Sequence, residues 1–325
     1  MATRNLAEAI LDNGLLSVNF FNGRLLSGED LSQEQEAQSE GRKRLGQAIG
    51  DGIVSGLEVT PSPTTSNTNP AVTIQAGLAI NRLGQTIQLP NSVDVMLFAS
   101  SSVPIAPSQS PFATCIPPQP GPYVAGAGVY LLTIAPAFGF EGRAPVSGLN
   151  VPGAAYSTCI SKYIVEGVKF GFVWLNMNNL PGISDDTRSL ITQLMSMTDI
   201  ASLSKLRNLL AHLCFGTEER GVTVSDAFSQ ANKPPIADYG LLATLRSLGS
   251  LADCDVPLAL LYWTTDGLRF VDMGSVRRRP VPGPPSQNWP LALGGGYPAI
   301  GEAMSIQFQE HIVQTLLQLL ALNLT

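Results

Sequence analysis

Apolar and polar residues alternate along several short stretches of this chain, which is the period of a half-buried β-strand. The clearest group of such stretches lies between residues 71 and 97. Its apolar positions form four successive faces: Val72 and Ile74; Leu78 and Ile80; Ile87 and Leu89; and Val93, Val95 and Leu97. Gly77 and Leu83-Gly84 separate these faces and indicate turns.

Later stretches continue the strand pattern with larger side chains. Their apolar faces are Tyr130, Leu132 and Ile134, and then Val168, Phe170, Phe172 and Trp174. Phe172 and Trp174 are large enough to dominate the core of a sheet. Residues 258–264 and 268–273 flank Thr265-Asp266-Gly267, which is a strong β-hairpin signal. Roughly seven or more strands separated by turns are typical of a sandwich or a barrel.

A helical period replaces the strand period between residues 184 and 250. Asp185 and Asp186 begin the first helix, and Gly216 is a typical stop for the second. The apolar positions of the three predicted helices are Leu190, Ile191, Leu194 and Met195; Leu203, Leu206, Leu209, Leu210 and Leu213; and Leu241, Leu242, Leu245 and Leu248. We interpret these helices as an insertion whose leucines form its own core, with docking to a partner as the alternative.

A segment rich in proline and glycine, residues 280–301, precedes a predicted C-terminal amphipathic helix. Its apolar face over residues 301–322 contains Met304, Phe308, Ile312, Leu316 and Leu319-Leu320. Three placements are open for this helix: on the β domain of its own chain, inserted into a neighbouring subunit, or on a membrane surface.

These patterns predict an α+β chain, with a mainly antiparallel β sandwich or barrel-like domain, an N-terminal helix, an α-helical insertion and a C-terminal helix. The predicted parts are an N-terminal docking loop and helix at 1–60, the first part of the β domain at 61–183, the helical insertion at 184–250, a completing hairpin at 251–282, and a linker with the C-terminal helix at 283–325.

The N-terminal helix is predicted to begin after Ser27, because Ser27 and Asp30 have the spacing of a capping box, and to end before Gly50. One stripe of this helix is apolar only at its ends: Leu31, Gln35, Gln38, Arg42, Leu45 and Ile49. A helix that fills its own core is apolar throughout such a stripe. We therefore expect either a solvated surface helix anchored at both ends or a helix that lies against another chain.

Two groups of residues suggest a family. The first is Phe20-Phe21-Asn22-Gly23-Arg24-Leu25-Leu26, then an acidic helix start, then Gly52-Ile53-Val54-Ser55-Gly56-Leu57. The second is Asp255-Val256-Pro257-Leu258-Ala259-Leu260-Leu261-Tyr262-Trp263 with Phe270-Val271-Asp272 and Arg277-Arg278-Arg279. Together they resemble tail and baseplate proteins of contractile injection systems and related phage-tail-like particles. The resemblance implies a structural component of such a particle.

Composition narrows the range of functions. Charged residues make up 14% of the chain, where about 25% is typical, so we expect partners to cover much of the surface. The net charge of −6 argues against nucleic-acid binding, which needs a basic footprint. The sequence contains no secretory signal and no apolar run long enough to cross a bilayer. We expect cytoplasmic synthesis and assembly, followed by association with a particle.

Catalytic motifs are absent from the sequence, which has no nucleophile elbow, no zinc-protease motif and no phosphate-binding loop. Four carboxylates could pair for acid–base catalysis only if the fold brought them together: Glu141, Glu166, Asp253 and Asp255. The cysteines are too widely spaced for a zinc site: Cys115, Cys159, Cys214 and Cys254. Buried free thiols are the default for all of them, although Cys115 and Cys159 could meet. We predict no enzyme activity, no cofactor and no metal.

The function expected from these observations is that of a non-enzymatic adaptor or anchoring subunit at the baseplate or its periphery. Its partners would be other baseplate or tail subunits in a symmetric particle, with a fibre, a target surface or the host membrane as further contacts. The candidate interface residues are Phe20, Phe21, Arg24, Leu25, Arg42, Arg277, Arg278, Arg279, Phe308, Ile312 and Leu316.

Three alternatives accompany this expectation. A receptor- or carbohydrate-binding fibre module would expose aromatic residues in loops, for which the candidates are Phe112, Tyr123, Phe138, Phe140, Tyr156 and Trp289. A membrane-anchoring subunit of the particle would use the C-terminal helix. A carried enzyme would gather carboxylates with raised pKa in a cleft.

Overall fold

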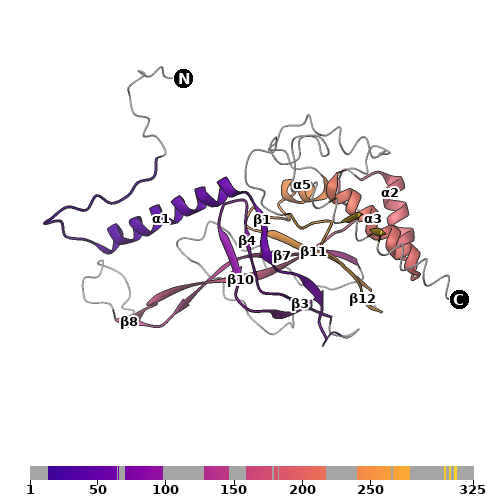
Figure 1. Ribbon diagram of the computed structural model, residues 1–325, viewed down its shortest axis with the longest axis horizontal. Coiled ribbons are helices and arrows are strands. Elements are labelled where there is room, and N and C mark those ends of the chain that lie inside the picture. The colour runs from indigo at the N-terminus through magenta and orange to yellow at the C-terminus, as the bar shows by residue number, and fades with distance from the viewer. Residues whose placement is uncertain are drawn as a thin grey trace, which may run out of the picture.

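The computed structural model (Figure 1) describes residues 14–63, 65, 70–97, 128–145, 159–177, 179–181, 183–216, 240–264 and 266–278, and residues 304, 307–308 and 311–312 of a C-terminal segment. The helices are α1 (Gly28–Ile49), α2 (Asp185–Met195), α3 (Ile200–Phe215) and α5 (Gly240–Ser247). The strands are β1 (Gly52–Gly56), β2 (Val59–Pro61), β3 (Ala71–Ile74), β4 (Gly77–Ile80), β5 (Thr86–Leu89), β6 (Val93–Met96), β7 (Gly128–Glu141), β8 (Ala144–Pro145), β9 (Cys159–Ile160), β10 (Tyr163–Trp174), β11 (Val256–Thr264) and β12 (Gly267–Asp272).

All strand pairs of the described residues are antiparallel. The central sheet has four strands in the order β10-β7-β11-β12, and two three-stranded sheets have the orders β1-β4-β5 and β2-β3-β6. Strands β8 and β9 form a small separate pair. Over the described ranges these sheets do not close into a barrel, so the predicted α+β class with antiparallel sheets is confirmed.

The two inner strands of the central sheet, β7 and β11, are buried on both faces except at the outer end of β7. One face packs against α2, α3 and α5 through residues such as Leu131 and Leu260, which share a core with Leu206 of α3. The opposite face packs against the two small sheets through Leu132 and Leu261, which follow Leu131 and Leu260 in the chain. Because successive side chains of a strand point to opposite faces, every residue from Gly128 to Ala135 of β7 and from Val256 to Trp263 of β11 is buried. The molecule therefore has three layers, of helices, central sheet and small sheets.

The helical insertion has the caps expected from its sequence. The hydroxyl of Ser184 accepts a hydrogen bond from the backbone N–H of Thr187 at the start of α2, and the Asp199 carboxylate accepts one from Ser202 at the start of α3. Gly216 ends α3, as predicted. Most of the insertion's leucines belong to the core shared with the central sheet, so their packing serves this chain.

One residue that the sequence pattern assigned to the core is exposed. Trp174 is 57% exposed, although the period of β10 assigned it to the same buried face as Phe172. Phe172 is half-buried and stacks on Tyr130 with their ring centroids 4.6 Å apart. Trp174 is the last residue of β10, which lies at the edge of the central sheet among the described strands. The expectation that Trp174 dominates a core was therefore wrong.

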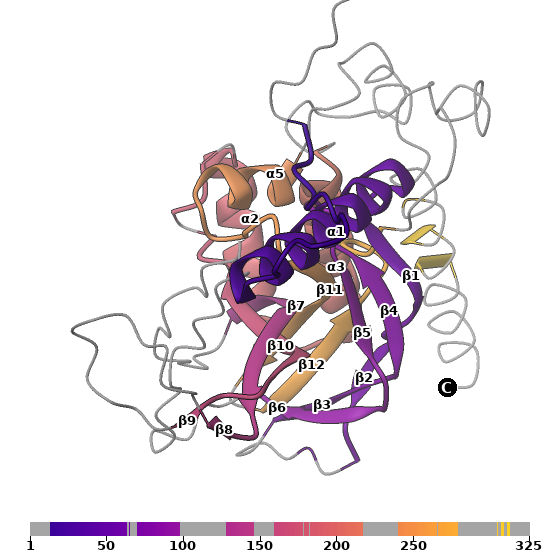
Figure 2. The same cartoon turned by 90° about the vertical axis from the view of Figure 1, so that its left-hand side faces the viewer.

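Helix α1 and the outer ends of β7 and β10 extend to the same side of the molecule, whereas α2, α3 and α5 lie on the opposite side (Figure 1). Figure 2 shows this side facing the viewer, with α1 in front of the sheets. None of the helices in the described ranges combines the length and hydropathy that crossing a bilayer requires.

Candidate functional site

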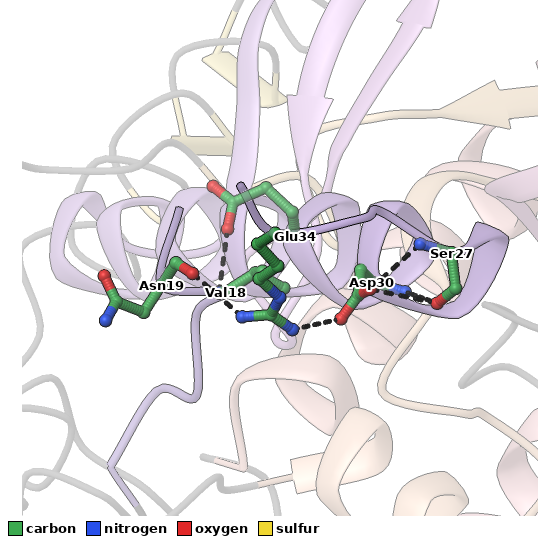
Figure 3. A network of polar contacts seen from close by, with 6 residues as sticks. Val18, Asn19, Ser27, Asp30 and Glu34 are labelled. Atoms are coloured by element: carbon green, nitrogen blue, oxygen red, sulfur yellow. Dashed lines mark hydrogen bonds and ion pairs between the residues drawn. The ribbon is translucent and has the colours of Figure 1, made fainter. Parts of the chain in front are cut away.

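A polar network fixes the start of α1 (Figure 3). The Ser27 hydroxyl accepts a hydrogen bond from the Asp30 N–H at 3.1 Å, and the Asp30 carboxylate accepts one from the Ser27 N–H at 3.0 Å. This reciprocal pair is the predicted capping box. The Arg24 guanidinium contacts the same carboxylate at 2.5 Å. The hydrogen bonds from Ser27, together with the Arg24 charge, hold the pKa of Asp30 below its ordinary value.

The N-terminal arm, residues 14–27, folds back beside α1. The Val18 N–H donates to a Glu34 carboxylate oxygen at 3.2 Å. Arg24 donates to the Asn19 carbonyl at 2.8 Å, and its guanidinium lies 5.9 Å from the centre of the Phe21 ring. The bonds of Val18 and Asn19 are drawn in Figure 3. Arg24, predicted as an interface residue, therefore connects the arm to the helix start within one chain.

The apolar side chains of the arm remain exposed. Phe20 is 53% exposed, Phe21 62% and Leu25 93%, although burying a side chain of this size contributes about 1.5–3 kcal/mol. Leu15, Leu16 and Leu26 on the arm are exposed as well, and so are Leu31, Leu45 and Ile49 on α1. Monomeric proteins seldom collect so many large apolar side chains on one projecting element.

Helix α1 is attached to the body near its C-terminal end. Gly46 is the buried residue among its 22 positions, and it lies against Gly84 in the turn between β4 and β5. Nearby, the Gln47 amide donates to the Leu83 carbonyl at 3.4 Å. The first turns of α1 therefore stand away from the sheets.

A groove of about 960 Å³ lies between α1 and the sheets. On the α1 side the groove is lined by every residue of the stripe described above except Leu31, namely Gln35, Gln38, Arg42, Leu45 and Ile49. The opposite wall includes Ile87 and Gln88 of β5, Phe138 of β7, and Glu166 and Val168 of β10. The wall formed by α1 carries the predicted interface residue Arg42, which is exposed. Phe138 is half-buried here, while Phe140 is exposed beyond the groove.

The arginines after β12 make contacts within the chain. Arg277 donates to the carbonyls of Gly56 at 2.5 Å and Leu57 at 3.1 Å, and Arg278 lies 5.1 Å from the centre of the Phe215 ring. Arg279 lies outside the described residues. The role of these arginines at an interface stays a prediction, and the contacts of Arg277 and Arg278 give both residues a structural role.

The described residues of the C-terminal segment divide into two sets. Gln307 is buried beside Ser275, whose hydroxyl lies 3.5 Å from the Gln307 side-chain oxygen, and Met304 packs on Ala211 and Phe215. Phe308 and Ile312 are exposed, and Leu316 lies outside the described residues. This part of the segment thus lies against its own chain while two of its predicted interface residues face outward.

Of the four carboxylates considered for catalysis, Asp253 and Asp255 have structural partners, whereas Glu141 on β7 and Glu166 on β10 lie apart. Asp253 is 3.7 Å from both Arg82 and Arg246, and Asp255 accepts a hydrogen bond from Ala252 at 2.9 Å. Burial raises the pKa of Asp255. Within the described ranges, no three His, Cys, Asp or Glu side chains are arranged to hold a metal ion.

The cysteines have different environments. Cys214 is a buried free thiol, as expected, and burial raises its pKa to about 12. Cys254 is disulfide-bonded, so the expectation of a free thiol was wrong for this residue. The alternative that Cys115 and Cys159 meet lies outside the described side chains, as do the aromatic candidates Phe112, Tyr123, Tyr156 and Trp289.

Sequence comparisons add no relative to this description. No protein-family model matches the chain, and no curated protein is significantly similar to it.

Proposed function

We propose that this chain is a non-enzymatic structural subunit of a contractile injection system or a related phage-tail-like particle, located at the baseplate or its periphery. It acts as an adaptor that binds neighbouring subunits through the N-terminal arm and α1. The proposal combines the resemblance of residues 20–26 and 52–57 to such proteins with the surface that these residues adjoin.

The observation that carries the proposal is the exposure of Phe20, Phe21 and Leu25 on an element whose described residues are attached to the body near Gly46. A partner that covers these side chains gains their burial at little further cost, because the capping network already orders the helix start. The layered β domain would hold successive adaptors at a constant spacing. In a symmetric particle, many modest contacts of this kind add up through avidity.

Particle association tests this function. Native lysate is fractionated on a density gradient, and the fast-sedimenting fraction is examined by mass spectrometry. We expect the wild-type chain to sediment with sheath and tube proteins, in assemblies formed in the cytoplasm. Recovery of the wild-type chain solely in slowly sedimenting fractions would refute the assignment.

A pair of variants tests the role of the arm. Phe20→Ser combined with Phe21→Ser should abolish incorporation while leaving the circular dichroism spectrum unchanged, since neither side chain belongs to a core. Trp174→Ser is the matched control, because Trp174 is similarly exposed but lies on β10. Normal incorporation of the double variant would exclude the arm as the docking element.

A further inference from the structure

The N-terminal arm contains a strand pattern that its own chain does not use. Leu16, Val18 and Phe20 alternate with Ser17 and Asn19, which is the period of a β-strand with one buried face. The described backbone of residues 14–27 nevertheless belongs to no strand. Around Val18 the arm is held to α1 by the hydrogen bond from the Val18 N–H to the Glu34 side chain, and the bond from Arg24 to the Asn19 carbonyl lies within the arm itself.

Strand β10 has an outer edge with which a segment of this strand pattern could pair. It is the outermost strand of the central sheet and, among the described strands, pairs with β7 alone. Its outer half, Tyr163–Gly167, is exposed and contains the apolar residues Ile164 and Val165, a single charge on Glu166, and no proline. A row of unpaired N–H and C=O groups on such an edge is a template for a further strand.

We propose that the arm of one copy of this chain adds as a strand to the outer half of β10 in a second copy. Leu16–Phe20 and Tyr163–Gly167 have equal lengths, and each spans about 17 Å as a strand. Glu166 is the one charge in the two segments, so their pairing opposes no like charges. Main-chain hydrogen bonds would supply affinity, and alternate side chains would fix the register.

The two surfaces differ, so an arm that is not exchanged reciprocally makes a heterologous contact, which repeats from copy to copy as a ring or an open filament. This inference rests on the proposed role in a multi-subunit particle and names the chain itself as one partner. Its test uses purified full-length protein and is independent of particle association, so the two proposals can fail separately.

Variants in which either the arm or the β10 edge is blocked from pairing test the strand addition, by size-exclusion chromatography with light scattering. Val18→Pro with Phe20→Pro removes two donors from the arm. Ile164→Pro and Val165→Pro are made separately on β10, because neighbouring N–H groups point to opposite edges and one of the two variants loses only an outward donor. Val165→Lys is a second edge variant that keeps every ladder hydrogen bond and places a charge on the edge. Circular dichroism checks that each variant is folded.

Wild-type protein should form oligomers whose size increases with concentration. The arm-blocked variant, the proline variant that loses an outward donor and Val165→Lys should each be monomeric. An equimolar mixture of an arm-blocked and an edge-blocked variant should give a dimer and nothing larger, because each supplies the part that the other lacks. Hydrogen exchange should slow at Leu16–Phe20 and Tyr163–Gly167 together in wild-type oligomers. A wild-type protein that stays monomeric at all concentrations, a mixture that does not dimerise, or oligomers that persist in both kinds of variant would overturn the proposal.

Discussion

Gly46 of α1 and Gly84 of the turn before β5 meet backbone to backbone. A Cβ atom on Gly46 would collide with the main chain of Gly84, and one on Gly84 would collide with the carbonyl of Lys43. Gly84 also has a φ of +77°, a conformation that strains residues with a side chain. No larger pair of residues would let α1 approach the sheets this closely, so the two glycines set the position of the helix.

Gly46→Ala should lower the free energy of unfolding by about 1–3 kcal/mol, because the added methyl group overpacks a contact between backbones. Gly41→Ala is the matched control on the same helix, since its added Cβ would have no neighbour within 4 Å. The control should be neutral or stabilising by up to about 1 kcal/mol through helix propensity. Urea unfolding measures both variants, and equal effects would contradict the importance of the Gly46–Gly84 contact.

The capping network predicts a pH response at the start of α1. The pKa of Asp30 is below 3.8 because Ser27 and Arg24 favour its ionised form. A lowered pKa contributes stability that is present above the unfolded-state value and is lost as the pH falls through the folded-state value. The first turn of α1 should therefore fray in that acid range.

Carboxyl NMR titration of Asp30, with amide exchange of residues 28–31, measures this response. Ser27→Ala should move the pKa of Asp30 back toward 3.8 and speed the exchange. An unchanged pKa in that variant would show that Ser27 does not hold the carboxylate.

Cys214 should resist alkylation in the folded protein. Burial raises its pKa from 9.0 to about 12, so the reactive thiolate is scarce at neutral pH. Iodoacetamide labelling followed by peptide mapping should leave Cys214 unmodified until denaturant is added. Labelling of Cys214 in native buffer would mean that α3 opens readily.

The same shift predicts a stability slope at high pH. Above pH 9 the unfolded chain loses the Cys214 proton while the folded chain retains it, so stability falls as the pH rises toward 12. The slope is at most about 1.4 kcal/mol per pH unit. Cys214→Ala should lack this component, which comparison of denaturant midpoints at pH 9 and pH 10.5 would reveal.

Asp272 should be among the most sensitive residues of the chain. It is fully buried, accepts a hydrogen bond from Ser275 at 2.5 Å and lies 3.3 Å from the Arg207 guanidinium. Asp272→Asn removes the charge that compensates Arg207 and should destabilise the protein by about 3–5 kcal/mol. Asp266→Asn in the exposed hairpin turn is the control and should change stability by less than about 0.5 kcal/mol. Similar unfolding midpoints for the two variants would disprove the role of this pair.

Local patterns in the sequence predicted much of the fold. Alternation between residues 71 and 97 placed four strands, and Ser27 with Asp30 correctly predicted a capping box, because both signals arise between residues close in the chain. The exposure of Trp174 could not be predicted from local alternation, since it depends on where the neighbouring layer ends. A period specifies the face of a strand but not whether another element covers that face.

The candidate site was predictable in part. Phe20, Phe21 and Leu25 were predicted to lie at an interface; they are exposed, and their contact with a partner stays a prediction. The roles of Gly46 and Arg277 were missed because their partners, Gly84 and the carbonyls of Gly56 and Leu57, are distant in sequence. The presence of a glycine or an arginine in a sequence does not indicate which distant residue it contacts.

The attachment of α1 at one end gives this subunit a pivot. From Gly46 to Gly28 the helix rises about 27 Å at 1.5 Å per residue, and the arm lies at its far end. A rotation of about 10° at the pivot moves that end by about 5 Å on this geometry, without altering a single strand pair. In the proposed assembly, such a rotation would let copies with identical sheets reach neighbours at unequal distances, which a rigidly fused arm would not allow.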